Sequence, residues 1–216
     1  AEIIRPILRG RDIKRYGYDF ADLWLINSHN GIKSKNIPPI NINDYPAIKA
    51  HLDNFYDKLI KRTDKGDTPY NLRNCIYTDD FFKQKIIYPN MTKFLPFYYD
   101  DCGFMTNQKC FIITGENIAY LIAFLNSSIF KLCFRDNFPE LLGGTRELSK
   151  IFFEKIPVKQ ITNTVNESFK ILVKSIQQKK SKNIDTTYEE QKIEEMLWDI
   201  YNLTDIEREI CKSFMF

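Results

Sequence analysis

Residues 5–16 read RPILRGRDIKRY, a stretch that predicts the first strand of a sheet and the basic loop that follows it. The apolar run 2–8 (EIIRPIL) is typical of a β-strand, and Gly10 places a turn directly after it. The stretch contains one acid, Asp12, against five bases: Arg5, Arg9, Arg11, Lys14 and Arg15. Because an arginine side chain matches a guanine edge or a phosphate in two hydrogen bonds, this loop suits a polyanionic partner.

Further along the chain, short apolar runs between turn residues predict the rest of a sheet. They are rich in β-branched and aromatic residues, as strands are. The predicted strands are ADLWLI (21–26), KIIYP (85–89), FLPFYYD (94–100), CFIIT (110–114) and FFEKIPV (152–158), the last as a strand or an extended exit. The polar segment 27–43 predicts a surface loop.

Two stretches before residue 160 have the features of helices. Residues 45–62 predict a single helix, capped by Asp44, with Pro46 in its first turn and one apolar stripe. The segment 117–134 is apolar on almost every side and predicts a buried helix. The stripe of the first helix consists of Ile48, Leu52, Phe55, Tyr56, Leu59 and Ile60.

Strand signals disappear beyond residue 160, where amphipathic helices are predicted. Phe169, Leu172, Val173 and Ile176 share one helix face. Thr187 with Glu190, and Thr204 with Glu207, have the spacing of capping boxes and predict two further helix starts. The expected fold is therefore α+β, with a mixed domain over residues 1–160 and a helical C-terminal tail over residues 161–216.

The composition excludes several classes of protein. With 44% hydrophobic and 14% aromatic residues among 216, the chain is neither disordered nor of low complexity. A net charge of +3 is too small to indicate a nucleic-acid partner, so only clustering of the charge argues for one. No run approaches about 18 apolar residues, so we expect no membrane partner. Five cysteines without a CxxC motif predict buried free thiols in a reducing cytosol.

Motifs of known catalytic chemistry are missing from the sequence. There is no P-loop, GxGxxG or GxSxG motif. His29 and His51 are far apart and the cysteines are not clustered, so no metal site is predicted. The acidic pairs Asp57-Lys58 and Glu154-Lys155 lack the spacing that a metal-dependent nuclease needs. We therefore expect a binding module with no catalytic residue.

Two further basic clusters fall in predicted loops. Residues 61–73 (KRTDKGDTPYNLR) contain Lys61, Arg62, Lys65 and Arg73. The region 90–109 holds bases together with amides that suit adenine edges in the major groove of DNA, namely Asn90, Lys93, Asn107, Gln108 and Lys109. Acids such as Asp64 and Asp67 lie among these bases, so each cluster alone is also compatible with a solvated, salt-bridged surface.

The order of several short motifs resembles the specificity domain of type IIG restriction–modification enzymes and Taq-type adenine methyltransferases. Beyond the opening stretch, the resemblance is carried by Trp24-Leu25-Ile26, Tyr45-Pro46-Ala47-Ile48-Lys49, His51-Leu52, Leu59, Arg62, Asp64, Gly66, Pro69-Tyr70, Leu72-Arg73, Lys85-Ile86-Ile87-Tyr88, Cys110-Phe111-Ile112-Ile113-Thr114, Tyr120-Leu121, Leu125-Asn126-Ser127, Gly143-Gly144 and Lys155-Ile156-Pro157. The tail, with Leu197, Tyr201, Leu203-Thr204 and Glu207, is also similar to the usual end of the family.

This resemblance implies a target recognition domain, with a twisted, partly barrel-like sheet and packed helices that present loops to the major groove of double-stranded DNA. It also implies an upstream domain that binds S-adenosylmethionine and methylates adenine N6 after base flipping, preceded in type IIG enzymes by a nuclease domain that uses Mg. None of those motifs occurs here, and the chain begins at Ala1, so we expect a C-terminal fragment without a cofactor. Its expected location is the bacterial cytoplasm.

The expected DNA-binding residues follow from side-chain chemistry and loop position. Arginines, lysines and backbone amides would bind phosphates and set the register, while arginine and amide side chains would contact base edges. The predicted set is Arg9, Arg11, Lys14, Arg15, Lys65, Arg73, Lys93, Asn107, Gln108, Lys109 and Arg146.

Three alternatives remain open at the level of the sequence. A type I specificity subunit would normally show two recognition domains separated by long helices. A protein-interaction scaffold would use the amphipathic tail and bind no nucleic acid. A stand-alone nuclease would cleave DNA in the presence of magnesium.

Overall fold

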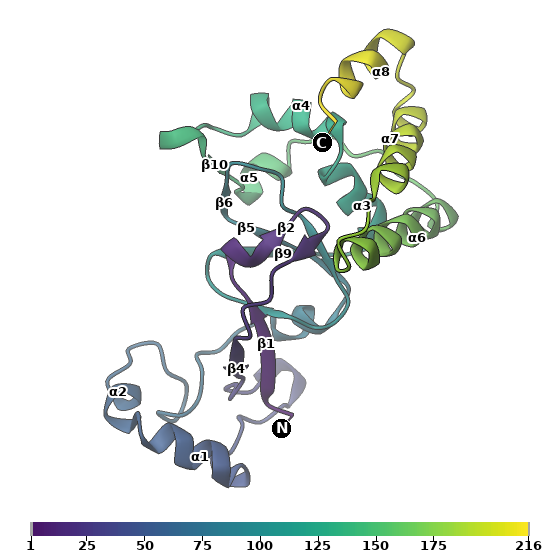
Figure 1. Ribbon diagram of the computed structural model, residues 1–216. Helices are drawn as coiled ribbons and strands as arrows, with labels where there is room; N and C mark the ends of the chain where they lie inside the picture. The colour runs from purple at the N-terminus through teal and green to yellow at the C-terminus, as the bar shows by residue number, and fades with distance from the viewer. Residues whose placement is uncertain (1, 216) are drawn as a thin grey trace.

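The computed structural model describes residues 2–215 and shows a mixture of strands and helices. A small lobe carries α1 (Pro46–Asp53) and α2 (Tyr56–Ile60) at one end of the molecule. The strands occupy the centre, and the remaining helices cover the other end (Figure 1). The predicted α+β class with a helical C-terminus is confirmed.

The strands form small sheets, and those of residues 2–215 do not close into a barrel. β1 (Ile4–Leu8) pairs antiparallel with β4 (Trp24–Ile26) and parallel with β8 (Met105–Thr106). β5 (Lys85–Pro89) lies between β7 (Tyr98–Asp100) and β9 (Cys110–Thr114), antiparallel to both. β2 (Ile13–Lys14) pairs with β3 (Gly17–Tyr18), and β6 (Met91–Thr92) with β10 (Arg146–Glu147). Short 3-10 helices are η1 (Gly10–Asp12), η2 (Lys33–Lys35), η3 (Ile42–Asp44), η4 (Thr78–Phe82) and η5 (Leu142–Gly144).

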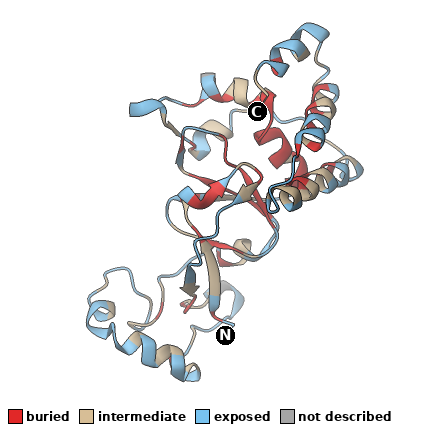
Figure 2. Cartoon of the chain, viewed as in Figure 1, coloured by how far each residue is buried: buried red, intermediate tan, exposed pale blue. Residues whose placement is uncertain are grey.

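Strand β5 is the centre of the core and is buried along its whole length (Figure 2). Because side chains alternate across a strand, Ile86 and Tyr88 enter the larger hydrophobic cluster while Ile87 packs with Leu8 in the smaller one. This burial on two sides explains the uninterrupted apolar run.

The apolar segment 117–134 forms two helices instead of the single helix predicted. α3 (Ile118–Leu125) and α4 (Ser128–Asn137) meet at a bend of 62°. The bend has a local cause, because the Ser127 side chain accepts a hydrogen bond from the backbone N–H of Phe130 and so caps α4. The prediction that this segment is buried holds for nearly all of α3. In residues 2–215 no single helix is long and apolar enough to span a membrane.

The helix predicted over residues 45–62 is also wrong in extent, because it breaks at residues 54–55 into α1 and α2. Neither helix has a buried residue, and Phe55, Tyr56 and Ile60 of the predicted core stripe are exposed. Leu52 and Leu59 are only half-buried. The apolar stripe therefore lies on the surface of the small lobe and does not pack into the main core.

The helical tail consists of α6 (Asn163–Lys180), α7 (Thr187–Tyr201) and α8 (Asp205–Lys212). The predicted face of α6 is confirmed, since Phe169, Val173 and Ile176 are buried in the main cluster. The Thr204–Glu207 capping box is present, whereas Thr187 and Glu190 form none. Glu190 instead accepts a hydrogen bond from Thr186 at 2.6 Å. The tail thus shares its core with the domain that precedes it.

Three smaller predictions are corrected. Residues 150–153 form α5 (Lys150–Phe153), so the strand or extended exit predicted over 152–158 begins inside a helix, and the strand over 94–100 is limited to β7. The thiols of Cys75 and Cys102 are exposed, in contrast to the prediction of buried thiols, whereas those of Cys110 and Cys211 are buried.

Candidate nucleic-acid interface

A groove of about 740 Å³ lies where the segment after β1 meets two turns of the central sheet. Its walls are η1 with β2, the β5–β6 turn with the residues that follow it, and the turn between β8 and β9. Gly10 makes the close approach possible, because a Cβ at this position would lie 3.1 Å from the carbonyl oxygen of Lys109 and 3.2 Å from the Cβ of Pro89. The glycine turn expected from the sequence is therefore also a packing contact between two loops.

The lining of this groove is basic. It contains no aspartate or glutamate and five bases: Arg9, Arg11, Lys14, Arg15 and Lys109. Asn107 also lines it, so six of the predicted DNA-binding residues come together here. Lys93 and Gln108 are the chain neighbours of lining residues, and both are exposed. Three loops distant in sequence thus gather positive charge on one surface.

Arg9 is held in place by Asp12. The guanidinium donates from Nε to Asp12 Oδ2 at 2.9 Å and from Nη2 to Oδ1 at 2.8 Å, and the Arg9 backbone N–H donates to the same carboxylate at 2.8 Å. These hydrogen bonds lower the pKa of Asp12 below its usual value, so the carboxylate stays ionised. The single acid of the opening stretch therefore orders the loop around η1.

The positive charge that is not paired within the protein lies on three bases in or beside the groove. The exposed side chains of Arg11, Lys93 and Lys109 form no hydrogen bond or ion pair with another described residue, and neither does that of the neutral Gln108. Lys14 forms a solvent-exposed ion pair with Asp19 at 3.2 Å. Surface pairs of this kind contribute little to stability, so the Lys14 ammonium remains available to a ligand.

Asn107 is partly used by its own turn. Its Oδ1 accepts the backbone N–H of Lys109 at 3.1 Å, which closes the loop between β8 and β9. The Nδ2 amide group forms no hydrogen bond within the described residues. In this conformation, Asn107 presents hydrogen-bond donors to the groove.

An apolar lip completes the groove and was not predicted from the sequence. Phe94 is 77% exposed and Met91 is 48% exposed, although both lie beside the buried β5 strand. The Phe94 backbone N–H donates to Thr92 Oγ1 at 3.0 Å, which fixes the turn that carries the ring. The available signal was the apolar pair inside the turn NMTKF, where polar residues are the rule.

Arg15 lines the same groove, but its guanidinium bonds within the protein. Nε and Nη2 donate to the carbonyl oxygen of Asn126 at 3.1 and 2.9 Å, and Nη1 forms an ion pair with Glu190 of α7. The structure therefore shows Arg15 in contact with the helical tail. Its contact with DNA stays a prediction.

The structure places three predicted residues outside the groove. Lys65 and Arg73 lie in the loop that follows α2; Lys65 Nζ donates to the carbonyl oxygens of Ile60 and Arg62, while Arg73 is exposed. Arg146 of β10 donates to the carbonyl oxygen of Phe138 and to Glu140 at 3.0 Å. Contact of these residues with DNA stays a prediction.

A metal-binding site is not found in the part of the chain that the structure describes. No group of three or more histidine, cysteine, aspartate or glutamate side chains there has the geometry to hold an ion. His51 is exposed, and burial lowers the pKa of the half-buried His29. The chemistry of the groove is thus that of hydrogen-bond donors and positive charge, which suits a ligand rich in acceptors.

A protein-family model matches most of the chain. The family model of the TaqI-like C-terminal specificity domain matches residues 5–158. The matched region begins in β1 and ends after α5, so it contains every wall of the groove. Helices α6, α7 and α8 lie beyond its end.

Proposed function

The chain belongs to the TaqI-like C-terminal specificity domain family, and from this premise we propose that it binds double-stranded DNA sequence-specifically as the target recognition part of a restriction–modification enzyme. The observation that carries the proposal is the groove at η1, whose lining has five bases and no acid. A surface of this kind attracts the phosphate backbone of DNA.

The side chains of the groove suit two different tasks. Lys14, Lys93 and Lys109 present compact charges, which suit phosphates and the setting of register. Arg11 and the Asn107 amide present directional donors, which suit the O6 and N7 acceptors of purine edges. Arg9 is held by Asp12 in a fixed orientation, so its remaining donors would reach a base without the cost of ordering the side chain.

The resemblance of the chain to this family also suggests the nature of the whole enzyme. It would be a type IIG enzyme or a Taq-type methyltransferase that modifies adenine N6, with or without an endonuclease. Binding of S-adenosylmethionine and Mg would belong to upstream domains of the same polypeptide, which would be the protein partner of this chain. The chain itself would be non-catalytic, and the enzyme would act in the bacterial cytoplasm.

The test is a fluorescence-anisotropy titration of the chain with labelled random-sequence duplex DNA at several salt concentrations. Wild-type protein is expected to bind with an affinity that falls as salt rises. Arg11→Ala and Lys109→Ala should each weaken binding, Lys109→Ala with a reduction of the salt slope by about 1. Arg135→Ala is the matched control, since Arg135 is exposed on α4 and is not part of the groove.

Selection of bound duplexes from a random library then separates base contact from phosphate contact. Arg11→Ala should relax one position of the selected sequence, with a cost of roughly 1–3 kcal/mol at that base pair. Absence of salt-dependent binding by both this chain and its parent enzyme would reject the proposal. Unchanged DNA affinity after substitution of both Arg9 and Arg11, in a chain that still folds, would favour the protein-interaction scaffold.

A further inference from the structure

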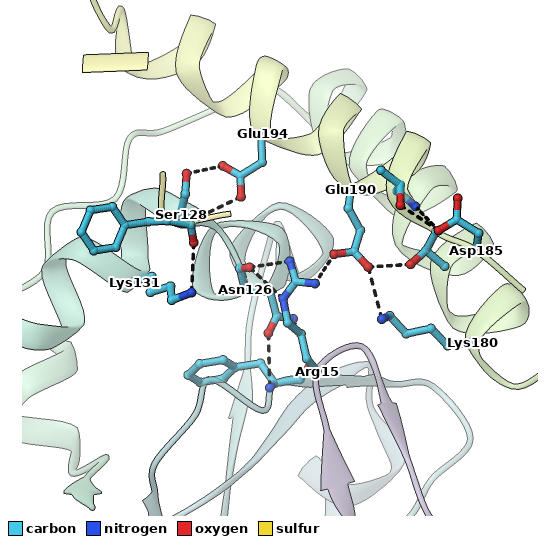
Figure 3. A network of polar contacts seen from close by, with 12 residues as sticks. Arg15, Asn126, Ser128, Lys131, Lys180, Asp185, Glu190 and Glu194 are labelled. Atoms are coloured by element: carbon cyan, nitrogen blue, oxygen red, sulfur yellow. Dashed lines mark hydrogen bonds and ion pairs between the residues drawn. The ribbon is translucent and has the colours of Figure 1, made fainter. Parts of the chain in front are cut away.

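A polar junction connects Arg15, which lines the groove, to the helical tail (Figure 3). Arg15 is at its centre, between the carbonyl oxygen of Asn126 at the end of α3 and the carboxylate of Glu190 on α7. The side chains of Arg15 and Glu190 are only 16% and 14% exposed. The ion pair is therefore largely shielded from water, where charge-assisted hydrogen bonds are strong.

The backbone around Arg15 is fixed by the same junction. Asn126 is fully buried, and its Nδ2 donates to the carbonyl oxygen of Phe97 at 3.0 Å. The same oxygen accepts the backbone N–H of Tyr16 at 3.0 Å. Tyr16 is buried with a φ of 58°, a left-handed conformation that a residue of this size adopts only where its surroundings hold it.

Glu190 is itself held on several sides. It accepts hydrogen bonds from Arg15 and from Thr186 Oγ1 at 2.6 Å, and it pairs with Lys180 at 3.2 Å. Burial alone would raise its pKa, but Arg15, Thr186 and Lys180 together lower the pKa below the usual value. Glu190 is therefore an ionised anchor on a helix beyond the family match.

Segment 9–15 is thus ordered by a contact within it at its first end and by contacts with other elements at its second. Arg9 is bonded to Asp12 at the first end, and Arg15 is bonded to Glu190 and Asn126 at the second. Arg11, which has no hydrogen bond or ion pair to another described residue, lies between them. The tail therefore contacts the segment that carries this exposed base.

We infer that Glu190 is a positioning residue for DNA recognition: through Arg15 it holds segment 9–15 in the conformation that presents Arg11 to the duplex. This inference rests on the proposed function. Fixing a binding loop before it meets its ligand removes an entropic cost from association. The helical tail therefore sets the affinity of the groove without touching DNA.

Electrostatics alone predicts the opposite result for loss of Glu190, which makes the inference testable. Glu190→Gln removes one negative charge, so a charge effect would strengthen binding to polyanionic DNA. A positioning effect weakens binding, because the neutral amide no longer pairs with Arg15. Glu195→Gln is the matched control: Glu195 lies on the same helix, pairs with Lys192 at 3.6 Å and accepts a hydrogen bond from Gln191 Nε2 at 3.1 Å, and these contacts do not involve Arg15 or Asn126.

The experiment measures anisotropy with labelled random duplexes and amide hydrogen exchange in the full chain. Glu190→Gln should weaken binding by about 2- to 30-fold, the range of couplings between connected sites, with an unchanged salt slope because no phosphate contact is lost. Amides of residues 10–16 should exchange faster in this variant. Glu195→Gln should bind as wild type or slightly more tightly, without faster exchange in residues 10–16.

Each outcome decides the question. Equal or tighter binding by Glu190→Gln, or equal weakening by both variants, would overturn the inference. If Glu190→Gln does not fold, Thr186→Val takes its place, since it removes one hydrogen bond from Glu190 and keeps the charge; unchanged binding and exchange in Thr186→Val would also overturn it. Absence of DNA binding by the wild type would instead reject the proposed function, while the exchange data would still test the coupling of α7 to segment 9–15.

Discussion

Segments 9–15 and 61–73 both have clustered bases around a glycine, yet the structure uses their charges in different ways. In segment 9–15, Asp12 and Glu190 hold the two outer arginines, and Arg11 stays exposed between them. In segment 61–73, Arg62 donates to the carbonyl oxygens of Pro69 and Asn71, both at 2.9 Å. The first cluster faces a groove, whereas Arg62 and Lys65 of the second bond to the backbone of their own loop.

The difference follows from what each segment packs against. Segment 9–15 rests on the core, since Ile13 and Tyr16 are buried there. The α1–α2 lobe has no buried residue in either helix, so polar contacts replace a hydrophobic core. Backbone carbonyls of an irregular loop need donors, and Arg62 and Lys65 supply them. A basic cluster is therefore evidence for a polyanionic ligand only where its side chains are not needed as hydrogen-bond donors to the backbone carbonyls of their own loop.

The largest effect is expected for Asn71→Ala in the lobe. Asn71 is buried; its Nδ2 donates to Ile40 O at 2.9 Å, and its Oδ1 accepts the Thr68 hydroxyl at 2.5 Å. The substitution removes both hydrogen bonds of a buried amide at once, each contributing up to about 1.5 kcal/mol, so we expect a destabilisation of about 3 kcal/mol, seen as a lower denaturation midpoint. The control Asn43→Ala removes an exposed amide and should change stability little.

This result would sharpen the comparison between the two segments. If the lobe is stabilised by its polar contacts, Asn71→Ala should raise hydrogen exchange in residues 61–73 and leave residues 10–16 unchanged. Equal increases in both segments would contradict their independence.

The second effect concerns the Arg9–Asp12 contact. Asp12→Asn loses charge-assisted bonds and should destabilise the chain by about 2 kcal/mol at neutral pH. Because the pKa of Asp12 is lowered from 3.8, the contact stabilises the fold above that pH, and the stabilisation is lost as the pH falls through the lower folded-state pKa. The difference between wild type and variant in urea unfolding should therefore shrink below about pH 4.

The exposed pair of Lys14 with Asp19 serves as the control for this experiment. Asp19→Asn should cost less than about 1 kcal/mol, since solvent screens the pair. A pH-independent difference for Asp12→Asn would show that the charge of Asp12 does not stabilise the turn.

Sequence patterns predict the individual strands and helices of this protein better than the contacts between elements that are distant in sequence. Strands β1, β5 and β9 were predicted, because β-branched residues between turns form a strand wherever they are buried. The break at Asn126–Ser127 was missed although its cap is local, because Asn126 and Ser128 are also held by Phe97 and by Glu194 of α7, which are distant in sequence. The position of Arg15 over Glu190 was missed for the same reason, as 175 residues separate them.

The third effect is expected for Gly10→Ala. The added methyl group would lie 3.1 Å from the carbonyl oxygen of Lys109, so two walls of the groove must move apart by a few tenths of an ångström. We expect a destabilisation of about 1 kcal/mol and a weaker affinity for duplex DNA. Gly17→Ala is the matched control, because a Cβ there meets no atom within 4 Å. Equal behaviour of the two variants would contradict the proposed contact.

The smallest effect compares two bases of segment 61–73 with each other. Lys65 Nζ already donates to two carbonyl oxygens, at 2.7 and 3.3 Å, whereas Arg73 is exposed and has no hydrogen bond or ion pair to another described residue. Arg73→Ala should therefore reduce the salt slope of DNA binding by about 1, and Lys65→Ala by less. Equal slopes for both variants and wild type would confine DNA contact to the groove. Equal reductions would mean that charge alone, and not the local hydrogen bonding, decides which bases of the lobe reach the duplex.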